Sequence, residues 1–224
     1  MLPPAIIYED NHLLIVQKPP GYMAQPDGGP RPDLLTWARG YLGRAKTGRA
    51  FVGLIHRLDQ PVGGVTALAK TSKGAARLSR QFRERTVDKI YLALIQSRLE
   101  GPEGRLDQTL IRDGHLTRPA RPGEEGRPAV LEWRPRRSAG GYTLLEIKLL
   151  TGFKHQIRAQ LAALGRPVAG DYKYGSRLAA DDLADGGPAI GLWAESLSFD
   201  HPVSRERLRF TALPPAAWPW TLLD

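Results

Sequence analysis

The stretch His56-Arg57-Leu58-Asp59-Gln60-Pro61-Val62-Gly63-Gly64-Val65 is the most informative part of this chain. It places one carboxylate, Asp59, between a basic pair and a glycine-rich turn, directly after the apolar run 51–55. A buried strand that ends in charged residues and then breaks on proline and glycine often displays a catalytic side chain. Beside His56 and Arg57, Asp59 is expected to be ionised and able to act as a nucleophile. The alternative is a surface ion pair at a strand end, and the rest of the sequence decides between the two.

The composition points to a polyanionic partner. The 224 residues include 32 Lys and Arg against 23 Asp and Glu, a formal net charge of +9. Such an excess suits nucleic acid held through phosphate contacts, although charge alone also fits a basic protein without such a partner. The absence of cysteine excludes disulfides, thiolate nucleophiles and cysteine-based metal sites. The length fits one large domain or two small lobes.

The first residues, Met1-Leu2-Pro3-Pro4, lack the features of a signal peptide, and no apolar run is long enough to cross a bilayer. We therefore expect a soluble cytoplasmic protein that does not bind membranes. We also expect a monomer.

The N-terminal part predicts a hairpin and a helix. The strand-like runs 5–8 and 13–16 flank a turn-prone tetrad, and Lys18 with the following prolines ends the hairpin. Asp33 is placed to cap a helix that stops near Gly43. The basic loop 44–49 fits a solvated surface loop and an RNA contact about equally well.

The part after Asp59 predicts a strand at 65–69, a helix and a second strand. Thr71 or Ser72 would cap the helix, which runs to about Arg85 with Leu78 and Phe82 on its apolar face. Its other face carries four basic residues, namely Lys73, Arg77, Arg80 and Arg83. The strand 89–95 places Tyr91, Ala93 and Ile95 on one side by alternation.

The stretch 101–137 is poor in apolar residues and rich in Gly, Pro and Arg, so we expect a strand or two with a long basic loop. A strand follows at 142–149, and then a helix from about His155 to Leu164 with Gly165 as its stop. Its core face is expected to hold Ile157, Leu161 and Leu164, and Arg158 lies off that stripe. Asp181, Asp182 and Asp185 fit a solvated loop better than a metal site.

Five blocks in order resemble the RluA-type family of RNA pseudouridine synthases. They are 13–21, 56–59, 80–82 with 89–93, 151–158 with 170–175, and 197–202 with 210–214. The chain departs from the family pattern at 62–64, 153–154 and 192–194. These departures leave Asp59, Tyr91 and Arg158 unchanged, and we expect the replaced positions to line the rim that faces RNA.

The resemblance implies an α+β fold with a mixed, largely antiparallel sheet in two halves, flanked by helices, and a basic central cleft. It further implies that residues 1–224 form a single catalytic domain without a separate N-terminal RNA-binding domain. The implied activity is the isomerisation of a specific uridine in ribosomal or transfer RNA, with base flipping and without cofactor or metal. The alternative is a non-catalytic RNA-binding or RNA-folding factor on the same scaffold. A nuclease or methyltransferase would need motifs that this sequence lacks.

The resemblance also assigns three catalytic roles. Asp59 is the nucleophile, and whether it attacks the sugar or the base, or abstracts a sugar proton, stays open. Arg158 keeps Asp59 ionised and oriented. Tyr91 stacks on the uracil, and its hydroxyl can relay a proton.

Five further residues are expected on the RNA-binding side. Arg57 would enter the gap left by the flipped base, and His56 would support the turn rather than transfer protons. His155 would contact a phosphate or cap its own helix, with both alternatives open. Lys18 is expected near the cleft, and Ile157, although on the core stripe, completes the set.

Overall fold

The structure is a computed structural model that describes residues 2–43, 50–178, 182–183 and 187–223. The basic loop 44–49, Asp181 and Asp185 lie outside these described residues. The chain divides into two compact units. Unit 1 comprises mainly Met1–Asp88 and Ala194–Pro214, and unit 2 mainly Lys89–Leu183, Pro188–Trp193 and Pro215–Asp224. No described helix is long and apolar enough to cross a membrane.

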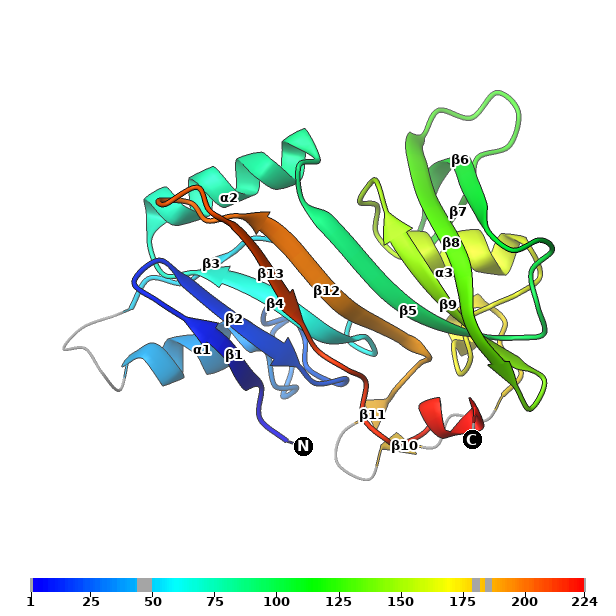
Figure 1. Cartoon of the computed structure of the whole chain (residues 1–224), viewed down its shortest axis with the longest axis horizontal. Coiled ribbons are helices and arrows are strands. Elements are labelled where there is room, and N and C mark those ends of the chain that lie inside the picture. Colours follow the sequence, from blue (N-terminus) through cyan, green and yellow to red (C-terminus); the bar gives the residue numbers. More distant parts are fainter. Residues whose placement is uncertain (1, 44–49, 179–181, 184–186, 224) are drawn as a thin grey trace. The chain divides into compact units, whose positions relative to one another are not determined.

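Unit 1 is built on a sheet with the strand order β1-β2-β4-β12, to which β3 adds beside β4 and β13 beside β12 (Figure 1). The strands are β1 (Ala5–Glu9), β2 (Leu13–Lys18), β3 (Gly53–Leu54), β4 (Gly63–Ala69), β12 (Leu192–Asp200) and β13 (Arg207–Thr211). The pairs β1–β2, β2–β4, β3–β4 and β12–β13 are antiparallel. The predicted N-terminal hairpin and the closing strands are therefore confirmed.

The apolar run before Asp59 forms less strand than its sequence predicts. Of residues 51–55, only Gly53 and Leu54 pair with β4, opposite Ala69 and Leu68. Gly53 lies so close to α2 (Ser72–Glu84) that a Cβ there would come within 2.9 Å of the Ala75 Cβ. This close approach leaves room only for glycine at position 53.

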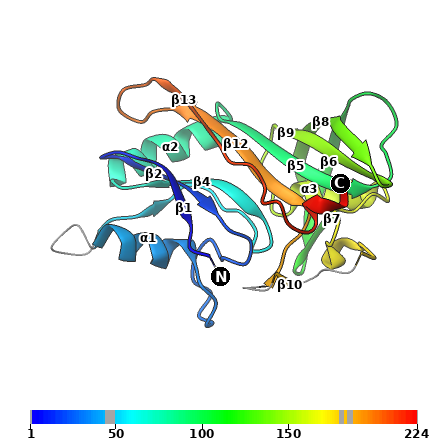
Figure 2. The same ribbon diagram turned by 60° about the horizontal axis from the view of Figure 1, so that its bottom comes forward.

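Helix α1 (Leu34–Gly43) begins and ends where the sequence predicts. The Asp33 Oδ1 accepts a hydrogen bond from the Thr36 backbone N–H at 2.8 Å, which satisfies one of the free donors of the first turn. Its buried face, Leu34, Ala38 and Leu42, packs against Leu14, Val16 and Leu68 of β2 and β4. Figure 2 shows α1 below β1, β2 and β4 in that view and α2 above β2 and β4. Burial of each leucine side chain on this face of α1 contributes about 1.5–3 kcal/mol.

Helix α2 is also capped as predicted. The Thr71 Oγ1 accepts from the Gly74 backbone N–H at 3.1 Å, and Arg85 ends the helix in the left-handed conformation with φ +59°. Leu78 is buried, and the Phe82 ring packs on the ring of His56. The apolar face of α2 is thus occupied inside unit 1.

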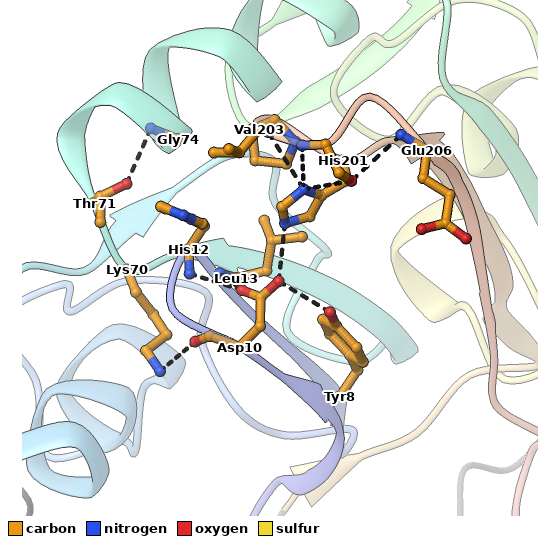
Figure 3. A network of polar contacts seen from close by, with 12 residues as sticks. Tyr8, Asp10, His12, Leu13, Lys70, Thr71, Gly74, His201, Val203 and Glu206 are labelled. Atoms are coloured by element: carbon orange, nitrogen blue, oxygen red, sulfur yellow. Dashed lines mark hydrogen bonds and ion pairs between the residues drawn. The ribbon is translucent and has the colours of Figure 1, made fainter.

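The turn between β1 and β2 is organised by one carboxylate (Figure 3). The Asp10 Oδ1 accepts from the backbone N–H groups of His12 and Leu13, both at 2.7 Å. Its Oδ2 accepts from the Tyr8 hydroxyl at 2.9 Å and lies 2.8 Å from the Nε2 of His201. Burial opposes the ionisation of Asp10, but these donors outweigh it and hold its pKa below the usual value.

The β12–β13 connection is joined to this turn through His201. The backbone N–H groups of Val203 and Ser204 donate to its Nδ1 at 3.3 and 3.0 Å. The ring proton therefore resides on Nε2, which donates to Asp10. Two turns that are far apart in the sequence are in this way fixed to each other.

Unit 2 contains the strand order β5-β9-β8-β6-β7, with each neighbouring pair antiparallel. The strands are β5 (Asp88–Gln96), β6 (Gly104–Asp113), β7 (Leu116–Pro119), β8 (Arg127–Ala139) and β9 (Tyr142–Leu149). The prediction of a long basic loop within 101–137 is wrong, because that stretch forms three strands. Residues alternate in burial along most of β6, and its outward positions are polar, so composition alone resembles a loop.

Helix α3 (Gln156–Ala163) packs against β6 and β7, and buried amides connect it to β8. Gln156 and Gln160 donate through Nε2 to the carbonyls of Val130 and Ala129 at 3.2 and 3.0 Å. Gly165 follows the helix with φ +69°, as predicted for its stop. Leu164, in contrast, is 42% exposed and does not face the core, because the helix has already ended.

The remaining elements are short. They are the 3-10 helices η1 (Tyr172–Tyr174) and η2 (Trp220–Leu223) and the strands β10 (Asp182–Leu183) and β11 (Gly187–Pro188). Leu223 of η2 packs on Leu94 and Ala169 in unit 2. Largely antiparallel sheets with a few helices against them confirm the predicted α+β class.

Candidate active site

Asp59 lies in unit 1, in the loop between β3 and β4, where it is half-buried. The Val62 backbone N–H donates to the Asp59 carbonyl at 3.1 Å, which closes a turn directly after the carboxylate. Leu58 is buried and anchors the loop in the core. After the loop, Gly64 in β4 has φ +121°, and a Cβ there would lie 2.2 Å from the Ala194 carbonyl oxygen. Asp59 therefore lies on a loop that is held at both ends.

Lys18 supports this loop from the interior of unit 1. Its side chain is fully buried, and its Nζ donates to the carbonyls of Tyr22, Pro19 and Gln60 at 2.8, 3.1 and 3.3 Å. Burial lowers the pKa of Lys18 to about 7, and the nearby Asp59 carboxylate acts in the opposite direction. The expectation that Lys18 contacts RNA is corrected, because its ammonium faces backbone carbonyls in the interior. Lys18 instead connects the end of β2 to Gln60, the residue after Asp59.

The two residues that open the motif differ in exposure. The His56 Nε2 accepts from the Ala67 backbone N–H at 3.1 Å, and the imidazole stacks on Phe82 at 5.0 Å between ring centroids. These contacts agree with a supporting role for His56 in the turn. Arg57 is exposed. It is therefore open to a ligand on this side of unit 1.

Unit 2 holds the other two predicted catalytic residues. Tyr91 lies on β5, half-buried and opposite Ile147 of β9. Arg158, in the first turn of α3, is 4% exposed and forms a two-pronged ion pair with Asp171. Its Nε donates to Oδ2 at 2.6 Å and its Nη2 to Oδ1 at 2.8 Å. Paired donors of this kind fix the plane of the guanidinium as well as its charge.

Asp171 is the site residue that sequence reasoning missed. It appeared only inside the block 170–175, with no role of its own, yet it is 1% exposed and sets the orientation of Arg158. Asp171 lies 13 residues after Arg158, and no helical or strand periodicity connects two residues at that spacing. Only its position inside a block shared with the family offered a signal.

Tyr174 completes the surroundings of Arg158. The Arg158 guanidinium lies 4.9 Å from the centre of the Tyr174 ring, and the Tyr174 hydroxyl accepts from the Thr117 backbone N–H at 2.9 Å. Burial raises the pKa of this hydroxyl, so it keeps its proton at neutral pH. The hydroxyl lies 2.8 Å from the Nδ1 of His155.

Two expectations for α3 are corrected. His155 occupies the N-cap position, but its side chain makes no capping hydrogen bond and bonds Tyr174 instead. Its backbone has φ +57°, in the left-handed region, so capping geometry is unavailable to it. Ile157 is 4% exposed and belongs to the core, not to a surface that could contact RNA.

The predicted residues thus form two groups. Lys18, His56, Arg57 and Asp59 lie in unit 1, whereas Tyr91, His155, Ile157 and Arg158 lie in unit 2. Across the described part of the chain, no group of three or more His, Cys, Asp or Glu side chains is placed to hold a metal ion. Among the predicted residues, the groups suited to acid–base or charge-stabilising chemistry are the Asp59 carboxylate, the Tyr91 hydroxyl and the Arg158 guanidinium.

Comparison with known proteins gives a consistent result. A model described as RNA pseudouridylate synthase matches residues 12–163. Ribosomal large subunit pseudouridine synthase D of Xanthomonas campestris pv. campestris is 33% identical over 219 residues, covering 94% of this chain and 66% of that protein. The same-named protein of Nitrosomonas europaea is 35% identical over 218 residues, covering 92% and 61%. This chain therefore spans slightly less than two thirds of the length of these two relatives.

A shorter relative matches along nearly its whole length. Dual-specificity RNA pseudouridine synthase RluA of Pasteurella multocida is 33% identical over 214 residues, covering 94% of this chain and 93% of that protein. The fold is shared with the structure titled Human RNA Pseudouridylate Synthase Domain Containing 4, with a TM-score of 0.77 and 24% identity over 95% of this chain and 89% of that one. This chain therefore belongs to the RNA pseudouridylate synthase family, and its relatives include proteins of the RluA type.

Proposed function

We propose that this protein is an RNA pseudouridine synthase that isomerises a specific uridine in structured RNA. The observation that carries the proposal is family membership over residues 12–163 together with Asp59 on a fixed loop of unit 1. The named relatives act on the large ribosomal subunit, or are dual-specificity enzymes, so ribosomal RNA is the first substrate to test and transfer RNA the second. The proposed enzyme acts as a monomer in the cytoplasm, with residues 1–224 as one catalytic domain.

Isomerisation breaks the bond between the sugar and the base nitrogen, rotates the base and rejoins it through carbon. A proton leaves the base carbon that forms the new bond and one is added at the freed nitrogen, so the composition of the nucleotide is unchanged and the overall reaction needs neither a redox partner nor an external energy source. In the proposed mechanism the Asp59 carboxylate starts the reaction at the flipped nucleotide. Attack on the sugar, attack on the base and abstraction of a sugar proton remain the three candidate first steps.

The other side chains would serve this step. Tyr91 would stack on the uracil and relay a proton, and Arg158 would stabilise the ionised carboxylate within a basic cleft. The pairing of Arg158 with Asp171 supports this role, because it orients the guanidinium before any substrate binds. Arg57 is exposed and is proposed to fill the gap that the flipped base leaves, which offsets part of the cost of unstacking.

The deciding experiment is pseudouridine mapping on ribosomal and transfer RNA from four strains. These are wild type, a deletion, Asp59→Ala and the control Asp107→Asn, which removes an exposed carboxylate from β6 of unit 2. We expect the deletion and Asp59→Ala to lose the same site or sites and the control to keep them. If Asp59→Ala keeps every pseudouridine, the catalytic assignment is wrong. If the deletion changes RNA folding or processing but no pseudouridine, the non-catalytic RNA-binding alternative replaces it.

A further inference from the structure

Helix α2 presents a row of cations that the proposed catalytic roles do not use. Lys73, Arg77, Arg80 and Arg83 are all exposed and follow one another at spacings of four, three and three residues. At such spacings side chains are neighbours on one helix face, and like charges there repel. We call these four residues the basic stripe. It weakens the isolated helix, so its charges point to a partner outside α2.

Few carboxylates neutralise the basic stripe within the described residues. Arg80 pairs with Glu84 at 2.7 Å, and both side chains are largely exposed, so this pair is weak. Arg77 donates to the Pro202 carbonyl, which holds its guanidinium in place without cancelling its charge. Lys73 and Arg83 form no ion pair with a described carboxylate. The face therefore stays strongly positive.

A basic amphipathic helix is also typical of membrane surfaces and of helices that dock in a partner's groove. Both need a free apolar face. In α2 that face is occupied, because Leu78 is buried and Phe82 stacks on His56. Both ends are held as well, by the Thr71 cap, visible in Figure 3, and by the left-handed Arg85. A rigid helix with only its cationic face available fits a polyanion.

The position of α2 within unit 1 connects it to the candidate catalytic loop. The Phe82–His56 stack joins the C-terminal half of the helix to the motif that carries Asp59. The side-chain amide of Gln81 bonds both backbone groups of Asp200 at 2.7 and 2.9 Å, which fixes the helix to β12. The helix that carries the basic stripe and the motif that carries Asp59 are therefore in direct contact within one unit.

We propose that the basic stripe of α2 is a second RNA contact, which holds the phosphate backbone of a double-stranded stem adjoining the target nucleotide. This inference rests on the proposed function for the identity of the partner. A straight row of cations matches the regular row of phosphates along one strand of a helical stem. Such contacts carry no sequence information, and their role is to position the RNA.

Binding of a double-stranded RNA about two helical turns long tests the proposal, with a single-stranded oligouridylate as the second probe. The variant Lys73→Gln/Arg80→Gln/Arg83→Gln removes three charges and leaves Arg77, which bonds Pro202. The control Arg134→Gln/Arg137→Gln/Lys148→Gln removes three exposed charges from β8 and β9 of unit 2. Dissociation constants are measured over a range of salt concentrations, and circular dichroism checks folding.

For the duplex, we expect the slope of log affinity against log salt to fall by about 2 to 3 in the α2 variant, since each phosphate contact contributes about 0.7–0.9. The control should keep the wild-type slope. Arg80→Lys/Arg83→Lys, which keeps both charges, should also keep it and guards against a folding defect. An equal fall in the control, or for the oligouridylate, would overturn the assignment of a stem to α2.

This measurement requires no isomerisation. A changed slope together with unchanged pseudouridines in the Asp59→Ala strain would leave the basic stripe assigned and the catalytic proposal rejected. An unchanged slope together with a loss of pseudouridines in the Asp59→Ala strain would reject the role of the basic stripe and leave the catalytic proposal standing.

Discussion

Among the described residues, each unit buries one Lys or Arg side chain, but the two charges are compensated in different ways. In unit 2, Arg158 meets the carboxylate of Asp171 through two parallel hydrogen bonds. In unit 1, the Lys18 ammonium is surrounded by three backbone carbonyls, with the Asp59 charge nearby as a weaker influence. A formal ion pair keeps its charges over a wide pH range, whereas dipoles alone leave a buried ammonium easy to neutralise. The comparison separates a permanent cation from one that pH can remove.

Removal of Asp171 should have the largest effect. Asp171→Ala leaves Arg158 buried without its carboxylate, and we expect the free energy of unfolding of unit 2 to fall by about 3–5 kcal/mol. Native-state hydrogen exchange of the β8 and β9 amides measures unit 2 separately. The double variant Asp171→Ala/Arg158→Met is the control and should recover most of the loss. Equal losses in both variants would show that the uncompensated charge is not the cause.

Replacement of the guanidinium by an ammonium sharpens the comparison. Arg158→Lys keeps the charge but cannot donate two parallel bonds, so we expect a loss of about 1.5–3 kcal/mol from one missing charge-assisted hydrogen bond. The same exchange experiment measures it, and Arg134→Lys, at an exposed position of β8, is the matched control. A loss as large as that of Asp171→Ala would mean that geometry, rather than charge, carries the pair.

The effect that is smallest per pH unit concerns Lys18. The pKa of Lys18 is about 7 in the folded protein against 10.5 in the unfolded chain, so from pH 7 upward the unfolded state binds the extra proton. The free energy of unfolding should therefore rise with pH by at most about 1.4 kcal/mol per unit. Below pH 7 both states carry the proton, and this contribution no longer changes.

Urea unfolding of wild type and Lys18→Met between pH 7 and the unfolded pKa of 10.5 measures that contribution. The variant has no ammonium to titrate, so its profile should be flatter than that of wild type. Lys148→Met, at an exposed position, is the control and should keep the wild-type slope. Parallel profiles in wild type and Lys18→Met would show that Lys18 stays charged in the interior.

Helix ends were well predicted because their signals are local. Asp33 and Thr71 accept hydrogen bonds from the first turns of α1 and α2, and Gly165 ends α3 in the left-handed region. One or two strands were expected within 101–137 and three are present; their extent was underestimated because β6 and much of β8 direct charged side chains to solvent. Such an antiparallel sheet needs apolar residues on one face only, so its average composition resembles a loop.

The sequence by itself determined the motif around Asp59, the loop that carries this motif, and the family that the five blocks resemble. These features are patterns of residue type and spacing, which the sequence records directly. Only the tertiary structure decided that Lys18 is buried under the Asp59 loop, that Ile157 lies in the core, and that Asp171 holds Arg158. Burial and long-range pairing depend on which surfaces pack together, and no local periodicity records that choice.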